Sequence, residues 1–308
     1  MVTMGELKKY GRVKLVMPGT SACPGCPLLM GIRFLSMALD LRFTMVIPAG
    51  CSSVIPGLAP KTAYTVPTLH VPFASSPAVA SGLARALKAR GVDGPVVVWA
   101  GDGATVDIGM AALSGAAYRN EDIIYILADN EAYMNTGIQA SGTTPWKAWT
   151  TTSPMGKSED RKDIDFIMIM HKVPYVATAS IAYPLDFIDK VRKAAGIRGF
   201  RFIHLHAPCP PGWRMDDSYT VKAAKLAVET GAWILWEYDR GVFRISPPSM
   251  PYRDKARRRP IEDYLKIQGR FSHLTREDIE EVRRRIDEEW DMVLRFAELF
   301  NPKKPQQG

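Results

Sequence analysis

The sequence predicts an α/β protein with a mainly parallel sheet, helices on both faces of the sheet, and a C-terminal helical arm. Two observations support this. Apolar runs rich in β-branched residues alternate with segments of helical periodicity, and the chain becomes basic and proline-rich beyond residue 245. With 46% hydrophobic and 23% charged residues among 308, the chain can bury one large core. We therefore expect one α/β domain over 1–245 and a basic linker with a helix, suited to contact a partner subunit, over 246–308.

The expected strands and helices follow one another along the first domain. Five apolar runs are expected as buried strands: 42–48, 95–100, 122–128, 173–179 and 200–206. Four stretches with apolar residues at helical spacing are expected as helices: 76–91, 105–120, 163–172 and 184–196. Because strand-helix-strand crossovers are right-handed, the carboxyl ends of the parallel strands meet at one edge of the sheet.

The C-terminal segment contains a basic run, 253–260, and an amphipathic stretch, 275–300. Thr275 is the expected N-cap and Asp278 stands at the capping-box position. We expect a helix that packs against either its own domain or a partner subunit. The chain has a formal net charge of +8. We interpret the basic run as a solvated or partner-contacting surface and expect no nucleic acid, because no aromatic platform alternates with the charges.

The N-terminal segment is charged, and it lacks an apolar run long enough for a signal peptide. No window approaches the roughly 18 apolar residues of a membrane span. A cytoplasmic location without membrane contact is expected. Four cysteines, Cys23, Cys26, Cys51 and Cys209, are present. In a reducing compartment they indicate metal or redox chemistry, and burial as small apolar side chains is the alternative for the last two.

A glycine-rich turn in "VVVWAGDGATVDIG" places Asp102 directly after a predicted strand and before a predicted helix. Free backbone N–H groups and the helix dipole favour a phosphate there, and the glycines let the backbone approach it. A carboxylate beside phosphates requires a cation, and Mg²⁺ prefers oxygen ligands. The next strand ends in "LADNEAYMNTG", which brings the amide of Asn130 to the adjacent strand end. The two residues therefore indicate a magnesium-diphosphate site.

These motifs resemble the diphosphate-binding motif of thiamine diphosphate enzymes. The segment "DNEAYMNTGIQ", with "TTP" and "AWTTTSP" after it, is similar to β subunits of pyruvate:ferredoxin oxidoreductases, within the 2-oxoacid:ferredoxin oxidoreductase family. The resemblance runs from about Ala22 to Tyr238. It implies that Asp102, Asn130 and the Ala132 carbonyl bind Mg²⁺. The residues that it places at thiamine diphosphate are Gly50, Cys51, Ser52, His70, Gly101, Asp102, Gly103, Ala104, Asn130, Ala132, Met134, Asn135 and Thr136.

Two of these assignments have alternatives. The resemblance places Asn135 at the reacting centre as the catalytic candidate, whereas a loop-capping asparagine would explain the same residue. His70 is expected either to contact the cofactor or to make a structural hydrogen bond.

The resemblance also assigns the cysteines. In the family a CxxC pair, a cysteine in a Gly-Cys loop and a fourth cysteine late in the domain hold one 4Fe-4S cluster, and these match Cys23, Cys26, Cys51 and Cys209. A Cys₄ zinc site would use the same ligands and stays open on the residues alone. Many relatives read "CAGCG" where this chain has "CPGCP", and many have an acidic residue where this chain has Ser53. Neither difference removes a ligand, but both leave substrate choice and cluster potential open.

The function implied by the resemblance is oxidative decarboxylation of pyruvate to acetyl-CoA and CO₂. Electrons would pass through the cluster to ferredoxin, and coenzyme A would take the acyl group. Branched-chain 2-oxoacids or 2-oxoglutarate are the alternative substrates. Thiamine diphosphate enzymes use two α/β domains, and this chain has motifs for one. We therefore expect an α subunit that supplies the activating glutamate, and further γ and δ subunits. A zinc-structured nucleic-acid module and a decarboxylase without electron transfer are the competing classes.

Overall fold

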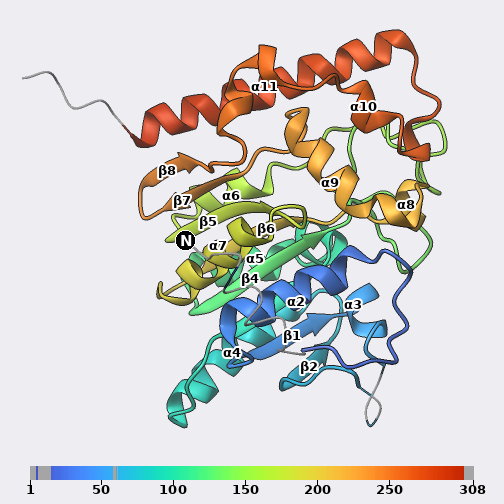
Figure 1. The fold of residues 1–308 in the computed structure, drawn as a ribbon. Coiled ribbons are helices and arrows are strands. Elements are labelled where there is room, and N and C mark those ends of the chain that lie inside the picture. The colour runs from blue at the N-terminus through green and yellow to red at the C-terminus, as the bar shows by residue number, and fades with distance from the viewer. Residues whose placement is uncertain (1–4, 6–14, 58–59, 61, 302–308) are drawn as a thin grey trace, which may run out of the picture.

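An eight-stranded sheet forms the centre of the computed structural model, which describes Gly5, residues 15–57, Pro60 and residues 62–301. The strand order is β2-β1-β3-β4-β6-β5-β7-β8 (Figure 1). The strands from β2 to β5 in this order are parallel, and β7 runs antiparallel to both β5 and β8. The predicted mainly parallel sheet is confirmed. The strands are β1 Thr44–Pro48, β2 Thr68–Val71, β3 Val96–Ala100, β4 Ile123–Asp129, β5 Tyr175–Ser180, β6 Arg201–His206, β7 Trp236–Asp239 and β8 Val242–Ile245.

Helices cover both faces of this sheet, as predicted (Figure 1). The longer helices are α2 Pro27–Leu39, α4 Ser76–Ala89, α5 Met110–Tyr118, α6 Ile164–Met170, α7 Pro184–Ala195, α9 Thr220–Glu229 and α11 Arg276–Phe300. The short helices are α3 Cys51–Val54, α8 Pro210–Trp213 and α10 Glu262–Leu265. The four helices expected in the first domain correspond to α4, α5, α6 and α7, although the second of them begins later than predicted.

Alternate residues of each central strand point to opposite faces, and each face has its own apolar core. On one face, Val97 and Trp99 of β3 share a cluster with Ile32 of α2 and with residues of α7. On the other face, Val96 and Val98 share a cluster with residues of α4, α5, α6 and α11. Every residue of β3 and β4 is buried, which explains why both strands are continuous apolar runs in the sequence.

The predicted helix over 105–120 is wrong in its first turn. The chain instead forms a π-turn over Gly103–Asp107, and α5 begins only at Met110. The Thr105 hydroxyl donates to the Gly101 carbonyl at 2.7 Å. A Cβ on Gly109 would lie 1.8 Å from the Ala104 carbonyl oxygen, so only glycine permits this wider turn.

The C-terminal helix α11 packs against the chain's own sheet. Trp290 and Val293 are buried in the same apolar cluster as residues of β8, and the predicted capping box of Thr275 and Asp278 is present. The basic run is tied to the same chain by ion pairs, for example from Lys255 and Arg258 to Asp287. The division of the chain after residue 245 stays a prediction. In the part of the chain that the structure describes, no helix has both the length and the apolar character to cross a membrane.

Candidate cofactor site

A cavity of about 310 Å³ lies at the carboxyl ends of β1, β3 and β4. The GDG turn forms one wall, and the loop after β4 forms another. Trp99 and Phe73 contribute apolar surface. The predicted cofactor residues that line the cavity are Gly50, Cys51, Ser52, Gly101, Asp102, Gly103, Asn130, Ala132, Met134, Asn135 and Thr136. The structure therefore brings together residues as distant in the sequence as Gly50 and Thr136.

Two predicted residues are not among the residues that line this cavity. His70 lies on β2, beyond β1, and its buried Nδ1 has no hydrogen-bond partner among the described residues. The Ala104 side chain is buried in the apolar cluster on the α4 and α5 face. The contacts predicted for both residues stay predictions.

Asp102 is nearly completely buried, with 3% of its surface exposed. Its Oδ2 accepts a hydrogen bond from the Ser141 hydroxyl at 2.5 Å. Burial, together with the nearby charge of Asp129, raises the pKa of Asp102 well above its usual range. None of the ion pairs between described residues includes Asp102. A bound cation would supply the missing positive charge at this position.

Asn130 lies opposite Asp102 at the end of the neighbouring strand. Its backbone carbonyl accepts a hydrogen bond from Trp213 Nε1 at 2.9 Å. Its side-chain Oδ1, in contrast, is buried and has no hydrogen-bond partner among the described residues. Buried polar atoms are almost always bonded, so an orphaned amide oxygen beside a buried carboxylate fits a cation that takes oxygen ligands.

Close packing fixes the GDG turn. A Cβ on Gly103 would lie 2.1 Å from Cε1 of Tyr133, so the Tyr133 ring lies directly against this glycine. The Tyr133 hydroxyl donates to Asp107 at 2.8 Å, which holds the ring in place. Gly101, Asp102 and Gly103 line the cavity, and the Tyr133 ring lines it beside them.

The four cysteines converge on a second, smaller cavity of about 80 Å³. Cys26 is the N-cap of α2, Cys51 begins α3 and Cys209 is the N-cap of α8. The two cavities share Leu28, Cys51, Asn130 and Asn135 as lining residues. The cysteine cavity and the cofactor cavity are therefore direct neighbours. Burial raises the pKa of Cys51 and of Cys209 to about 12.

Four cysteines that line one cavity are, as a ligand set, suited to a zinc ion or to an iron-sulfur cluster. Zinc-sulfur bonds of about 2.3 Å in a tetrahedral site place the four sulfurs roughly 4 Å apart. Among the residues that the structure describes, no group of three or more His, Cys, Asp and Glu side chains stands in positions suited to one metal ion. The zinc site, which uses the same ligand set, stays an alternative to the cluster.

Sequence reasoning missed the hydroxyl groups that hold Asp102. Ser141 and Thr143 lie in an irregular loop about 40 residues further along the chain, and both reach the Asp102 carboxylate. The run "SGTTP" carries three hydroxyl residues, but nothing in its spacing links it to the GDG turn.

Comparison with known proteins identifies the family. Residues 48–205 match the family described as "Thiamine pyrophosphate enzyme, C-terminal TPP binding domain". The chain is 50% identical over 285 residues to pyruvate synthase subunit PorB of Methanothermobacter marburgensis, covering 91% of this chain and 97% of the relative. The chain belongs to the β-subunit family of the 2-oxoacid:ferredoxin oxidoreductases. The expectation drawn from the motifs is confirmed, and the chain carries a thiamine diphosphate-binding domain.

Other relatives of this β subunit have names that refer to different substrates. Ketoisovalerate oxidoreductase subunit VorB of Pyrococcus abyssi is 46% identical over 293 residues, covering 92% of this chain and 93% of the relative. A solved 2-oxoglutarate:ferredoxin oxidoreductase from Magnetococcus marinus superposes with a TM-score of 0.56 at 26% identity, covering 70% of this chain and 80% of that chain. These names bear on the fold and family of this chain, and they leave its substrate open.

Proposed function

We propose that this chain is the β subunit of a pyruvate:ferredoxin oxidoreductase that binds thiamine diphosphate through Mg²⁺ and holds a 4Fe-4S cluster. The observation that supports it most strongly is the pair of adjoining cavities, one with Asp102 and the unpartnered oxygen of Asn130, the other lined by all four cysteines. Bound thiamine diphosphate would supply an electron sink for decarboxylation of a 2-oxoacid.

The residues of this chain have separate tasks in the proposal. Asp102, Asn130 and the Ala132 carbonyl would hold Mg²⁺, which would neutralise negative charge of the diphosphate. The backbone of Gly101 and Gly103, which line the cavity and have no side chains of their own, would approach the diphosphate. Asn135 lines both cavities, so its amide can orient a substrate bound between them. The walls formed by Trp99 and Phe73 would exclude water from the reacting atoms.

Cys51, in the wall that the two cavities share, would hold the cluster next to the cofactor, and the cluster would supply one-electron chemistry there. Thiolates are the usual ligands of iron-sulfur clusters, and Cys51 lines both cavities. The prediction is that the anaerobically purified chain contains about four iron atoms and absorbs broadly in the visible range. Cys209→Ser should remove most of the iron, whereas Ser21→Ala, at a residue of the same cavity without a thiol, should keep it. Full iron in Cys209→Ser would assign the cluster to other residues or to a partner subunit.

Partners, ferredoxin, coenzyme A and a cytoplasmic location belong to the same proposal. The relatives are named as subunits, which supports α, γ and δ partners, with the α subunit completing the cofactor pocket. The four cysteines are free thiols, as in a reducing compartment. Rapid oxidation of 2-oxoacid by the purified chain alone would contradict the need for an α subunit.

The substrate is tested with the co-expressed complex. Methyl viologen reduction with pyruvate, 2-oxoisovalerate and 2-oxoglutarate should be fastest with pyruvate. Branched-chain 2-oxoacids are the second candidate, because the ketoisovalerate relative, at 46% identity, is nearly as similar as the pyruvate synthase relative at 50%. A higher rate with 2-oxoisovalerate would assign the complex to that class, and equal rates with all three substrates would remove the pyruvate assignment.

A further inference from the structure

A loop of small hydroxyl residues, Ser141–Thr144, lies behind the Asp102 and Asn130 strand ends. We call it the hydroxyl loop. It bonds to Asp102 and to the last residue of the π-turn that follows, because Ser141 donates to Asp102 and the Gly142 N–H donates to Asp107 at 2.9 Å. Thr143 and Thr144 in turn reach the end of β4. One short loop therefore connects the two strand ends that carry the proposed magnesium ligands.

Each hydroxyl has only one hydrogen to donate, so the distances indicate where it goes. Ser141 lies 2.5 Å from Asp102 Oδ2 and 3.3 Å from each threonine hydroxyl, so it donates to Asp102. Thr143 lies 2.8 Å from Asp129 Oδ1 and 3.3 Å from Asp102, so it donates mainly to Asp129. Thr144 donates to the Glu131 carbonyl at 2.6 Å. The three donors thus serve Asp102 and the two residues on either side of Asn130.

The same contacts fix the backbone around Asn130. Asp129 Oδ1 also accepts the Glu131 N–H at 2.8 Å, which closes a turn over Asn130. Asp129 Oδ2 is 2.8 Å from Nε2 of His204. Asn130 is therefore held through its neighbours and its own carbonyl, and its side-chain oxygen is left without a partner among the described residues.

We propose that Ser141 and Thr143 are positioning residues for the metal: they fix Asp102 Oδ2 and the Asp129 carboxylate, so that Asp102 Oδ1 and Asn130 Oδ1 face one cation. The inference rests on the proposed magnesium-diphosphate site and adds residues to it. Partners that orient metal ligands typically contribute about 10- to 100-fold in metal affinity.

The test uses the complex stripped of its cofactors. Calorimetry measures the binding of thiamine diphosphate to it at increasing Mg²⁺ concentrations. Ser141→Ala should raise the Mg²⁺ midpoint by about 10- to 100-fold, and Thr143→Val by about 10-fold, since each loses one donor but keeps its fold. Thr143→Ser retains the hydroxyl and should keep the wild-type midpoint. Ser81→Ala is the matched control, because Ser81 is also 5% exposed but donates to Pro77 within α4.

The shape of the titration separates positioning from damage to the fold. If a variant only misplaces the metal ligands, the Mg²⁺ midpoint rises, and thiamine diphosphate still binds with full stoichiometry at high Mg²⁺. If a variant misfolds, the binding stoichiometry is lower at every Mg²⁺ concentration. Wild-type midpoints in both Ser141→Ala and Thr143→Val, or an equal shift in Ser81→Ala, would overturn the inference while the proposed function stands. Absence of Mg²⁺-dependent binding in the wild-type complex would overturn both.

Discussion

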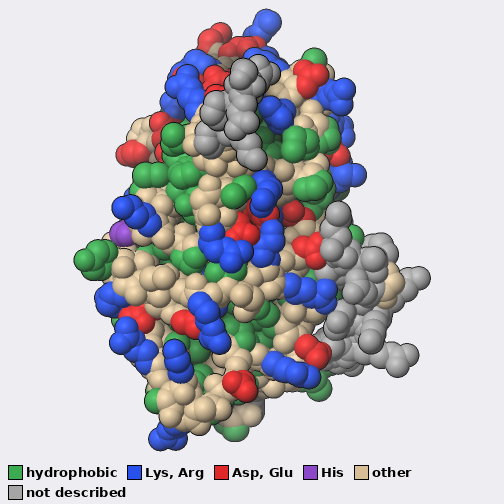
Figure 2. Space-filling model, turned by 90° about the vertical axis from the view of Figure 1, so that its left-hand side faces the viewer, with side chains coloured by type: hydrophobic (Ala, Val, Ile, Leu, Met, Phe, Trp, Pro, Cys, Tyr) green, Lys and Arg blue, Asp and Glu red, His purple; other side chains and the backbone are tan. Residues whose placement is uncertain are grey.

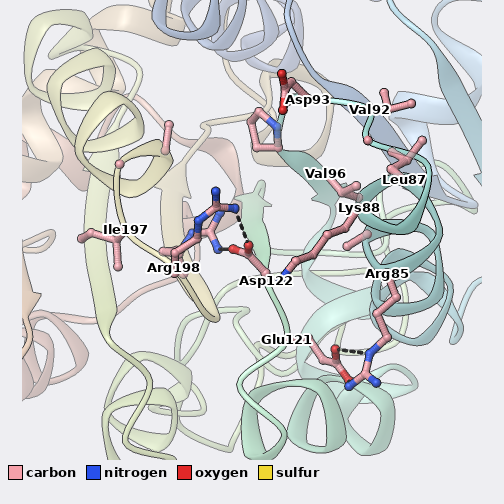
Figure 3. A pocket seen from close by; sticks show the side chains of 17 residues that line it. Arg85, Leu87, Lys88, Val92, Asp93, Val96, Glu121, Asp122, Ile197 and Arg198 are labelled. Atoms are coloured by element: carbon pink, nitrogen blue, oxygen red, sulfur yellow. Dashed lines mark hydrogen bonds and ion pairs between the residues drawn. The ribbon is translucent and has the colours of Figure 1, made fainter.

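Two cavities lie at opposite ends of the same parallel strands, and they differ in how their charges are satisfied. The larger one, about 710 Å³, lies at the amino ends, where α4 and α7 end (Figure 3). There Arg85 pairs with Glu121, and Asp122 pairs with Arg198 and Arg201. In the cofactor cavity at the carboxyl ends, Asp102 has no cationic partner and Asn130 Oδ1 has no hydrogen-bond partner among the described residues. The unsatisfied groups, and not the volume, distinguish the site.

Charges of both signs are also mixed on the surface around the larger cavity. Figure 2 faces the amino ends of the parallel strands and shows Lys and Arg side chains spread over the surface with carboxylates among them. Oppositely charged groups so close to water neutralise one another and leave little field for a ligand. Asp102, in contrast, is only 3% exposed, so its charge acts at low dielectric, where an uncompensated charge is costly and a cation is strongly favoured.

The largest expected difference between the two ends comes from removing one carboxylate at each. Asp102→Asn should weaken Mg²⁺-dependent thiamine diphosphate binding by about 100-fold or more, since a charged contact contributes up to about 3 kcal/mol. Asp122→Asn, in the larger cavity, should leave cofactor affinity unchanged. Calorimetric titration of both variants checks this. Equal losses would mean that the two ends are coupled and would remove the contrast.

Alanine substitution of one glycine at each end of the strands tests the same comparison through steric clashes, and the expected effects are smaller. In Gly103→Ala the new methyl group would meet the Tyr133 ring at 2.1 Å, so this ring, which lines the cofactor cavity, must move. We expect thiamine diphosphate affinity to fall by about tenfold, with destabilisation of about 1 to 3 kcal/mol. In Gly196→Ala the nearest atom, the Lys193 carbonyl oxygen, is 3.5 Å away, so stability should change by less than about 0.5 kcal/mol. Thermal unfolding and cofactor titration of both variants measure these effects.

The smallest expected effect is at the amino end and depends on pH. Burial alone would raise the pKa of Glu121, but hydrogen bonds from Arg85 and Arg119 outweigh it and lower the pKa below its ordinary value of 4.5. The ion pairs therefore stabilise the fold above pH 4.5, and this stabilisation is lost as the pH falls through the lowered value. Glu121→Gln should lower the melting temperature by a few degrees at pH 7, and the difference should shrink as the pH falls below 4.5.

Asp93→Asn provides the control for this pH effect. Asp93 lines the same cavity, and no ion pair from it is seen within the described ranges. The melting temperature of Asp93→Asn should equal that of the wild type both at pH 7 and below pH 4.5. A difference for Glu121→Gln that stays constant with pH would show that lost packing, and not the ion pairs, causes the effect.

The central strands were predictable from sequence because they are fully buried. β3 and β4 are continuous apolar runs, and burial on both faces requires such runs. The edge strand β2, with only Val71 fully buried among its four residues, carries no comparable signal and was missed. The hairpin of β7 and β8 was missed for a similar reason, because its strands are short and partly exposed.

Part of the candidate site was predictable for a different reason. The strands fix where their ends lie, so the sequence alone places Asp102 and Asn130 at one edge of the sheet. Ser141 and Thr143 reach Asp102 through an irregular loop whose path depends on tertiary contacts, such as the bond from Gly142 to Asp107. Nothing in local sequence periodicity encodes such a path. His70, expected either to contact the cofactor or to make a structural hydrogen bond, lies on the edge strand β2 outside the cavity lining, and its role stays a prediction.

The π-turn after Asp102 restricts the length of this part of the chain. Each residue advances a helix by about 100°, so deleting one residue between Gly103 and Met110 would rotate α5 by that angle. Leu113 and Ala116, which now lie in the apolar cluster beneath the sheet, would turn away from it. Single substitutions can be accommodated in this segment. A single insertion or deletion, in contrast, could not preserve both the cofactor turn and the packing of α5.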